Sequence, residues 1–321
     1  MKGNKTMKKN SVFALTLIAL VFTFCILFCV TTSAETYSGD CGTDDSSVQW
    51  TLDTSTGVLE ITGTGTMRDY EGAEAPWLTY QSVIRTVEIG DGVTSIGNAA
   101  FTLCTNLTSV TIPDSLSSIG DNAFYSCIQL KNITIPNQVT DIGNYAFYNC
   151  TSLTSIRIPD SVLKIGDSAF ASCAGLTDVV VPESVKRIGY RAFADCTSLA
   201  GITLPFVGAD ETSVSDDTSS NPNYKNFGYI FGASTVDENE KYVPSSLKTV
   251  TITGTVTYYD SSLTTIYNSA FYGCKNIISI TLGKGIRRLG ENVFAGCENL
   301  AEITIVRGIR EISNNAFCDT A

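Results

Sequence analysis

Apolar and polar positions follow one pattern that recurs every 23 residues along most of the chain. Phenylalanine returns at this step from Phe101 to Phe193, and the period resumes at Phe271. A cysteine stands three residues after each of the first seven of these phenylalanines, and a leucine or isoleucine three residues after each cysteine. The unit that begins at Leu107 fits the template L-x-x-[VI]-x-[IL]-P-x-x-[VL]-x-x-I-G-x-x-A-F-x-x-C. Such a period predicts a repeat array rather than conventional globular domains.

The spacing within one unit predicts a short strand followed by a return segment. Leu107, Val110 and Ile112 include an alternation of apolar and polar residues, which is typical of a strand with one buried face. Pro113 cannot donate a ladder hydrogen bond and ends the strand, and Gly120 is expected to permit a tight bend. One coil cannot offset an ordering entropy of roughly 1–2 kcal/mol per residue, so stability must come from stacking. The prediction is a right-handed parallel solenoid with a sheet along one side.

The expected strands stop following the period near the middle of the chain. They begin near Ile84, Leu107, Leu130, Leu153, Leu176, Leu199, Leu247, Ile277 and Leu300. Insertions at about 207–245 and 254–260 lengthen the coils after Leu199, and the polar stretch 207–226 predicts an exposed loop. Inserted loops in solenoids often carry binding function. Surface decoration without a function is the alternative, because lengthening a loop costs little closure entropy.

The N-terminal part of the chain does not carry the repeat. Lysines, an apolar run over Val12–Val30 and small residues up to Ala34 predict that residues 1–34 are a secretory signal. An uncleaved membrane anchor is the alternative, because the run is near the minimum length of a spanning helix. Residues 35–83 contain a strand-turn-strand pattern and are expected to form a β-rich cap over the open end of the array.

The template resembles the leucine-rich repeats of BspA-like surface proteins, which carry the same A-F-x-x-C and I-P-x-x-V-x-x-I-G signatures. The resemblance covers about residues 84–317, and the opening segment from Tyr37 to Trp77 and the stretch FGYIFGAS are also similar to secreted members. It implies a parallel-β leucine-rich repeat array of about nine coils over 84–321. It further implies a secreted or cell-surface protein that adheres to partners of varied kinds.

Composition narrows the chemistry that is open to the chain. There is no histidine, which excludes Ser-His-Asp and Cys-His catalysis and histidine-ligated zinc. The net charge of −11 and the pI of about 4.5 argue against a nucleic-acid partner. Loss of residues 1–34 would remove four lysines and no acid, leaving 17 basic and 32 acidic residues. No membrane insertion is expected after that cleavage.

The recurring cysteines present a choice between disulfides and free thiols. Stacked strands lie about 4.7–4.9 Å apart, whereas a disulfide requires Cβ atoms about 3.5–4.5 Å apart. We therefore expect free, buried thiols that pack as small hydrophobic groups, with a disulfide framework as the alternative in an exported protein. Cys41 and Cys318 lie outside the column and are expected to be accessible.

Adjacent carboxylates are the remaining catalytic candidates, because a glycosidase needs no histidine. These candidates are Asp44-Asp45, Asp210-Glu211, Asp216-Asp217 and Asp237-Glu238. All lie in polar stretches that are typical of solvated loops, and 210–217 lacks the ligand spacing of a calcium loop. The sequence therefore predicts a protein that is not an enzyme, with no catalytic residue, cofactor or metal; a carboxylate glycosidase is a remote alternative.

The outward positions of the strands form the candidate binding surface. These positions are Ser109, Thr111, Asn132, Thr134, Ser155, Arg157, Asp178 and Thr203. Threonine also suits a strand face for structural reasons, and only Arg157 is of a type enriched in protein interfaces. We expect adhesion to a protein or glycan on a host or microbial surface, through this sheet face or the inserted loops. A passive spacer, or a fragment of a larger surface protein, is the alternative, because the last coil stops after Phe317.

Overall fold

The computed structural model of the protein describes most of the chain beyond the predicted signal segment. Its described residues are 35–44, 47–71, 74–209, 225–254, 264–306 and 308–320. The predicted signal segment 1–34, residues 210–224 of the first predicted insertion and nearly all of 254–260 lie outside them. Residues Thr36–Ala321 form one compact unit.

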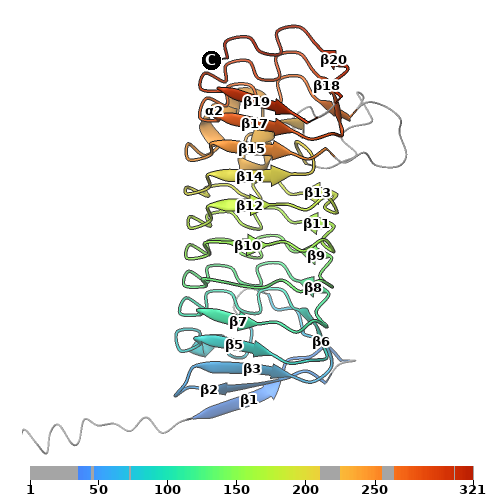
Figure 1. Cartoon of the computed structure of the whole chain (residues 1–321). Coiled ribbons are helices and arrows are strands. Elements are labelled where there is room, and N and C mark those ends of the chain that lie inside the picture. Colours follow the sequence, from blue (N-terminus) through green and yellow to red (C-terminus); the bar gives the residue numbers. More distant parts are fainter. Residues whose placement is uncertain are drawn as a thin grey trace, which may run out of the picture. The chain divides into compact units, whose positions relative to one another are not determined.

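One strand-bearing side of the coils, made of a five-stranded and a six-stranded sheet, contains eight of the nine strands predicted from the repeat; the coil of Leu130 contributes only isolated bridges (Figure 1). Its parallel strands are β3 (Val58–Thr62), β5 (Thr86–Ile89), β7 (Ser109–Thr111), β10 (Ile156–Arg157), β12 (Asp178–Val180), β14 (Gly201–Leu204), β15 (Thr249–Ile252), β17 (Ser279–Leu282) and β19 (Glu302–Ile305). Parallel bridges from Ser109 to Asn132 and from Thr134 to Arg157 join β7 to β10 across the coil of Leu130. Equivalent repeat positions face one another, so the predicted parallel leucine-rich repeat solenoid is confirmed. We call this surface the first sheet.

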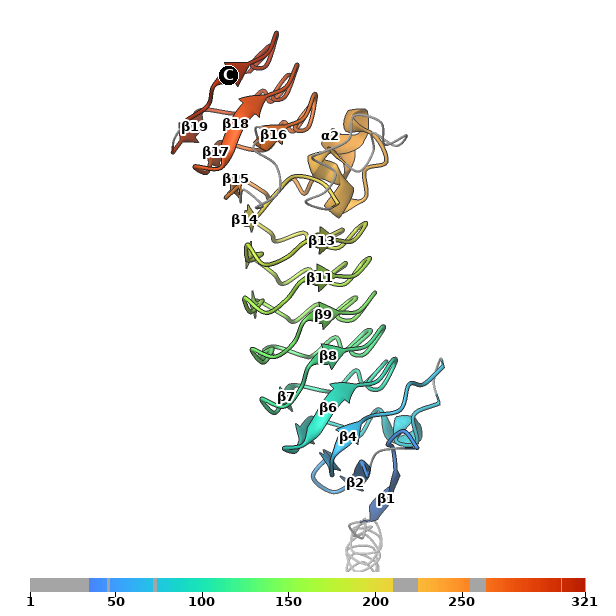
Figure 2. The ribbon, with the colours of Figure 1, turned by 90° about the vertical axis from the view of Figure 1, so that its right-hand side faces the viewer.

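The prediction of a sheet along one side was incomplete, because a second set of parallel strands lies on another side of the coils (Figure 2). These strands are β4 (Gly65–Thr66), β6 (Val93–Ile96), β8 (Ser118–Ile119), β9 (Asp141–Ile142), β11 (Lys164–Ile165), β13 (Arg187–Ile188), β16 (Thr264–Ile266), β18 (Ile286–Leu289) and β20 (Glu311–Ile312). Six of the nine end at the isoleucine or leucine that precedes the repeat glycine, namely β6, β8, β9, β11, β13 and β18. Most are only two residues long, which is too short for an alternating pattern to reveal them.

The repeat glycines allow successive coils to approach at the backbone. A Cβ on Gly143 would lie 2.5 Å from the carbonyl carbon of Gly120 in the preceding coil. Gly120 and Gly143 are not among the residues with a left-handed backbone, so the predicted role in a tight bend was wrong. The glycine is needed because no side-chain atom fits between the coils. Beside it, the Asp121 carboxylate accepts the Asn144 N–H at 2.6 Å, and the Asn144 amide oxygen accepts the Asp167 N–H at 2.8 Å.

The third side of each coil uses left-handed residues to present its N–H groups to the next coil. Asn122 and Ser126 both have φ of 56° and flank Phe124, whose N–H donates to the Ala146 carbonyl at 2.8 Å. Phe124 and Phe147 stack with ring centroids 5.3 Å apart, and equivalent contacts run from coil to coil. Trp77 begins this aromatic column by stacking on Phe101 and donating its indole N–H to the Ala100 carbonyl.

The β-rich N-terminal segment already contains part of the stack. β1 (Thr36–Asp40) and β2 (Gln49–Asp53) pair antiparallel, and β2 pairs antiparallel with β3. β3 and β4 pair parallel with β5 and β6, and the short helix η1 (Leu78–Tyr80) follows Trp77. The coil register therefore extends into residues 58–83. A separate cap over 35–83 stays a prediction.

The first predicted insertion contributes to the core where it is described. Gly208 and Ala209 are buried, and the Ile188 N–H donates to the Ala209 carbonyl at 2.7 Å. The η4 helix (Phe227–Phe231) is buried along its whole length, and Phe227 stacks on Phe271 at 4.6 Å. The exposed loop predicted over 207–226 is therefore wrong for the described residues at its two ends, where Gly208, Ala209 and Asn226 are buried.

One buried amide holds this irregular coil together. Asn239 begins the short helix α2 (Asn239–Tyr242), which follows η5 (Val236–Glu238). Its amide oxygen accepts the Gly228 N–H at 3.0 Å, and its amide nitrogen donates to the carbonyls of Ala270 at 3.2 Å and Tyr272 at 3.1 Å. A single fully buried side chain thus connects η4 to the next coil.

We expect Gly143→Ala to lower the free energy of unfolding by about 3 kcal/mol, because the new methyl group would overlap the preceding backbone. Urea titration at pH 7.5 measures this change. The matched control is Gly296→Asn: Gly296 has φ of 72°, a Cβ there would lie at an ordinary contact distance of 3.6 Å from Gly273, and asparagine tolerates that backbone, as Asn149 does at the same repeat position. The control should change stability by less than about 0.5 kcal/mol. Equal effects of both substitutions would contradict the close-approach role.

Asn239→Leu should lower the free energy of unfolding by about 3 kcal/mol, because it leaves the Gly228 N–H and the Tyr272 carbonyl without their partner and removes one of two donors to the Ala270 carbonyl. Asn299→Ala is the control, since the exposed Asn299 amide donates one hydrogen bond, to the Lys275 carbonyl. We expect about 1 kcal/mol or less for the control. The same urea titration compares the two, and a leucine variant as stable as the control would refute the role of Asn239.

Candidate functional site

All eight predicted binding residues lie on the outer face of the first sheet. Seven are exposed and Thr203 is partly buried. The parallel register places Arg157 opposite Val180 and Val180 opposite Thr203, with Asp178 two residues before Val180 on β12. The structure brings Arg157, Asp178 and Thr203 together around one hollow. Thr134 pairs with Arg157 just outside it. The other four are Ser109, Thr111, Asn132 and Ser155, and they do not line it.

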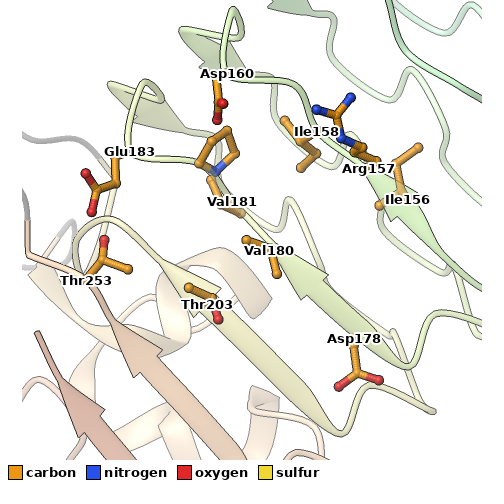
Figure 3. A pocket seen from close by; sticks show the side chains of 11 residues that line it. Ile156, Arg157, Ile158, Asp160, Asp178, Val180, Val181, Glu183, Thr203 and Thr253 are labelled. Carbon is orange, nitrogen blue, oxygen red and sulfur yellow. The ribbon is translucent and has the colours of Figure 1, made fainter.

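The hollow has a volume of about 490 Å³ and spans β10, β12 and β14 together with the segments that follow β10 and β12. Figure 3 shows the side chains around it. Its lining residues are Ile156, Arg157, Ile158, Asp160, Asp178, Val180, Val181, Pro182, Glu183, Thr203 and Thr253. The volume lies within the range of sites that accept a small molecule or several side chains of a partner. We call this feature the face hollow.

An exposed apolar side chain lies at the centre of the face hollow. Val180 occupies an outward strand position and is 60% exposed, although it is apolar. Its neighbours Val179 and Val181 are buried in the core, so the alternation of β12 requires Val180 to point outward. On the neighbouring strand Gly201 has no side chain, and a Cβ there would lie 2.6 Å from the Asp178 carboxylate. The missing side chain leaves room for Asp178 beside the hollow.

Three carboxylates stand around this apolar centre. Asp160 and Glu183 each follow the proline that ends a strand, and Asp178 begins β12. The Arg157 guanidinium donates to the Asn137 amide oxygen of the preceding coil at 3.5 Å. Among the described residues, none of the three carboxylates has a basic side chain within ion-pair distance. The hollow therefore combines an apolar floor with an excess of negative charge.

Sequence analysis did not select Val180, Asp160, Glu183 or Thr253 as site residues. A signal for the first was present, because Val180 is an apolar residue at a position that is polar in neighbouring coils. The acids that follow the strand-ending prolines also recur with the period. Thr253 gave no such signal, because the irregular coil before β15 hides its relation to the earlier strands.

The column thiols are structural groups. Every cysteine in the described residues is unpaired, as expected for the column, and all are buried except Cys318. The Cys150 thiol donates to the Phe124 carbonyl of the preceding coil at 3.3 Å. Burial raises the pKa of Cys150 to about 12, so this group is not a thiolate nucleophile at neutral pH. The expected accessibility of Cys41 was wrong, because that thiol is buried beneath the N-terminal strands.

Of the adjacent carboxylates selected from the sequence, only Asp237 and Glu238 both lie within the described residues. The Glu238 carboxylate accepts the Ser234 N–H at 2.6 Å and thereby closes a turn beside Asp237. Asp45 and the candidates within 210–217 lie outside the described residues. In the described ranges no three Cys, Asp or Glu side chains are grouped so that they could hold a metal ion. The same ranges include no helix of the length and apolar character that spanning a membrane requires.

The buried thiols predict a loss of stability at alkaline pH. The unfolded chain releases a thiol proton near pH 9, whereas folded Cys150 retains it until about pH 12. The unfolded state therefore binds fewer protons in this window, and folding stability falls as pH rises, by about 1.4 kcal/mol for one such thiol at pH 10.

Cys150→Ala should be less stable than the unsubstituted protein at pH 7.5, and the difference should narrow by about 1.4 kcal/mol at pH 10. Urea titrations at both pH values, under reducing conditions, measure it. Leu130→Val is the control, because it trims the same core without removing a proton. A constant difference for both variants would show that the folded thiol ionises at its ordinary pKa.

Comparison with known proteins supports the reading of the repeat. The family model of the BspA type leucine rich repeat region matches in six copies, over residues 79–200 and 245–321. A search of curated proteins found no match.

Several solved structures of bacterial leucine-rich repeat proteins are similar to this chain. The T. pallidum leucine rich repeat protein is 26% identical with a TM-score of 0.41, and covers 79% of this chain and 87% of its own. A leucine-rich repeat protein from Bacteroides ovatus is 23% identical with a TM-score of 0.44, covering 88% and 80%. A leucine rich cell surface protein from Faecalibacterium prausnitzii is 25% identical with a TM-score of 0.39, covering 90% and 87%.

Proposed function

Because this chain belongs to the BspA type leucine-rich repeat family, we propose that it is a secreted or cell-surface interaction protein that binds a protein partner. Partner binding occurs on the first sheet, at the face hollow, and holds the protein to a host or microbial surface. The protein performs no chemistry on its partner. The predicted signal segment over residues 1–34 supports export.

The observation that carries this proposal is the face hollow itself. Specific interfaces place a few anchors around a desolvated centre, with polar groups at the rim. Val180 supplies an apolar contact, and the Asp178 carboxylate supplies a directional polar group beside it. The regular threonine positions elsewhere on the face, such as Thr281 and Thr304, pair with each other across strands and need no ligand to explain them.

The other candidate functions have less support. A passive spacer needs no hollow on its face. A glycosidase needs two carboxylates about 5–9.5 Å apart across a substrate, with one of them held as an acid. Asp237 and Glu238 stand on a turn where the second carboxylate is used to accept a backbone N–H. These considerations favour binding without catalysis.

Capture of surface proteins tests the proposal. The purified protein is immobilised and exposed to a panel of extracellular-matrix proteins, mucin and bacterial surface proteins. We expect saturable binding of at least one panel member, and a loss of at least tenfold in affinity for Thr134→Lys/Thr203→Lys, which places two long side chains beside and within the face hollow. Biolayer interferometry measures both.

The control variant is Ser117→Lys/Ser118→Lys, which adds the same charge near the second set of strands. It should bind as well as the unsubstituted protein. Binding that survives the Thr134→Lys/Thr203→Lys change but is lost in the control would place the interface elsewhere. An absence of binding to every panel member would favour the passive spacer.

A further inference from the structure

The face hollow holds one exposed apolar side chain among three carboxylates. Figure 3 shows Val180 near the middle, with Asp160, Asp178 and Glu183 around it and Arg157 on the remaining side. We infer that the partner presents a cationic peptide segment here, with a lysine or arginine stem across Val180 and its cationic heads beside the carboxylates on the two sides of that residue. This inference rests on the proposed function, because it names the chemistry of the partner at the same site.

The charge balance of the hollow points to a cation. Its lining contains three carboxylates and one guanidinium, and the Arg157 guanidinium is directed toward Asn137 of the preceding coil. Where the chain is described, the only ion pairs between side chains lie outside this site. Exposed carboxylates without a partner attract a cationic ligand over about one Debye length, roughly 8–10 Å in physiological salt.

The apolar floor distinguishes a cationic side chain from a metal ion. In the described ranges, no three acidic or cysteine side chains are grouped closely enough to ligate a metal ion. Lysine and arginine combine an alkyl stem that packs on apolar surface with a head that seeks carboxylates. The hollow, at about 490 Å³, also accommodates residues that flank such a side chain. The observed surface therefore matches a peptide segment in both polarity and size.

Other occupants fit the hollow less well. A second copy of this chain, with its net charge of −11, would bring one acidic surface against another. Anionic membranes and nucleic acids are repelled for the same reason. The lining contains no aromatic ring on which a ligand could stack, and the only exposed apolar surface is that of one valine.

Fluorescence anisotropy with short labelled peptides tests the inference. The probe is a capped heptapeptide with a central Lys-Leu-Lys, compared with the same peptide carrying Glu-Leu-Glu and with a neutral oligosaccharide. We expect saturable binding of the lysine peptide alone, weakened as NaCl rises from 50 to 300 mM. Asp178→Asn/Glu183→Gln should weaken it at least tenfold, which corresponds to about 1.4 kcal/mol.

Two further variants are expected to change the affinity for the lysine peptide in opposite directions. Val180→Ser should weaken the lysine peptide several-fold without changing the salt dependence, because it removes apolar contact and no charge. Arg157→Ala should strengthen binding about two- to threefold, because it removes a like charge. The control is Asp91→Asn/Asp141→Asn, which neutralises two exposed carboxylates that do not line the hollow, and it should change affinity less than twofold.

The outcomes separate this inference from the proposed function. No binding of the lysine peptide at 1 mM, equal weakening by the control, or preference for the glutamate peptide or the oligosaccharide would overturn the cationic segment. Capture of a panel protein that is lost in Thr134→Lys/Thr203→Lys, together with any of these results, would leave the sheet-face interface intact. Weakening confined to the hollow variants supports both.

Discussion

The contact between the backbones of successive coils at the repeat glycine constrains the rest of the structure. No Cβ fits between Gly143 and Gly120, and the neighbouring side-chain oxygens of Asp121 and Asn144 each bind an N–H of the following coil. This approach fixes the distance and the register between coils on one side. The aromatic column at 5.3 Å and the parallel strands on the other sides then stack at a compatible separation.

Because the register is fixed, residues at the same repeat position in successive coils stack in a column. The residues of one column therefore have similar surroundings. The cysteine column illustrates this, because all seven thiols are buried and five of them donate to a phenylalanine carbonyl of the preceding coil. Burial therefore removes the thiols from redox and nucleophilic chemistry at neutral pH. Burial of these thiols also lowers the folding stability at alkaline pH, because the unfolded chain releases thiol protons that the folded chain retains. Because the buried columns serve packing, the outward positions are the ones that can bind a partner.

The sequence predicted the features that depend on many repeated contacts. The strands of the first sheet, the buried phenylalanines and the free column thiols followed from the period, because each depends on a pattern sustained over many coils. The second set of strands was missed because its two-residue pairings leave no alternation to detect. The irregular coil at η4 was missed because Asn239 and Phe227 stabilise it through contacts that no repeat position encodes.

For the candidate site, alternation predicted which residues face outward on the first sheet, but it did not predict the hollow. Outward positions could be assigned from alternation, which placed Arg157, Asp178 and Thr203 at the hollow. The hollow itself depends on side chains that differ from their column, such as Val180 on β12 and Gly201 beside it, and on Thr253 beyond an irregular coil. Local departures of this kind have meaning only after the neighbouring strands have been placed in register.

The acidic rim shows how a periodic protein can acquire a site with few changes. An exposed polar residue follows the strand-ending proline in successive coils, at Asp114, Asn137, Asp160 and Glu183. Three of these four residues are acidic, and Phe206 follows the next strand-ending proline, so the column selects no position by itself. On β12 the outward residue is Val180, where the preceding coil carries Arg157 and the following one Thr203. Only there does the acidic column border an apolar floor, and these residues are exposed enough to vary without disturbing the packing that holds the coils together.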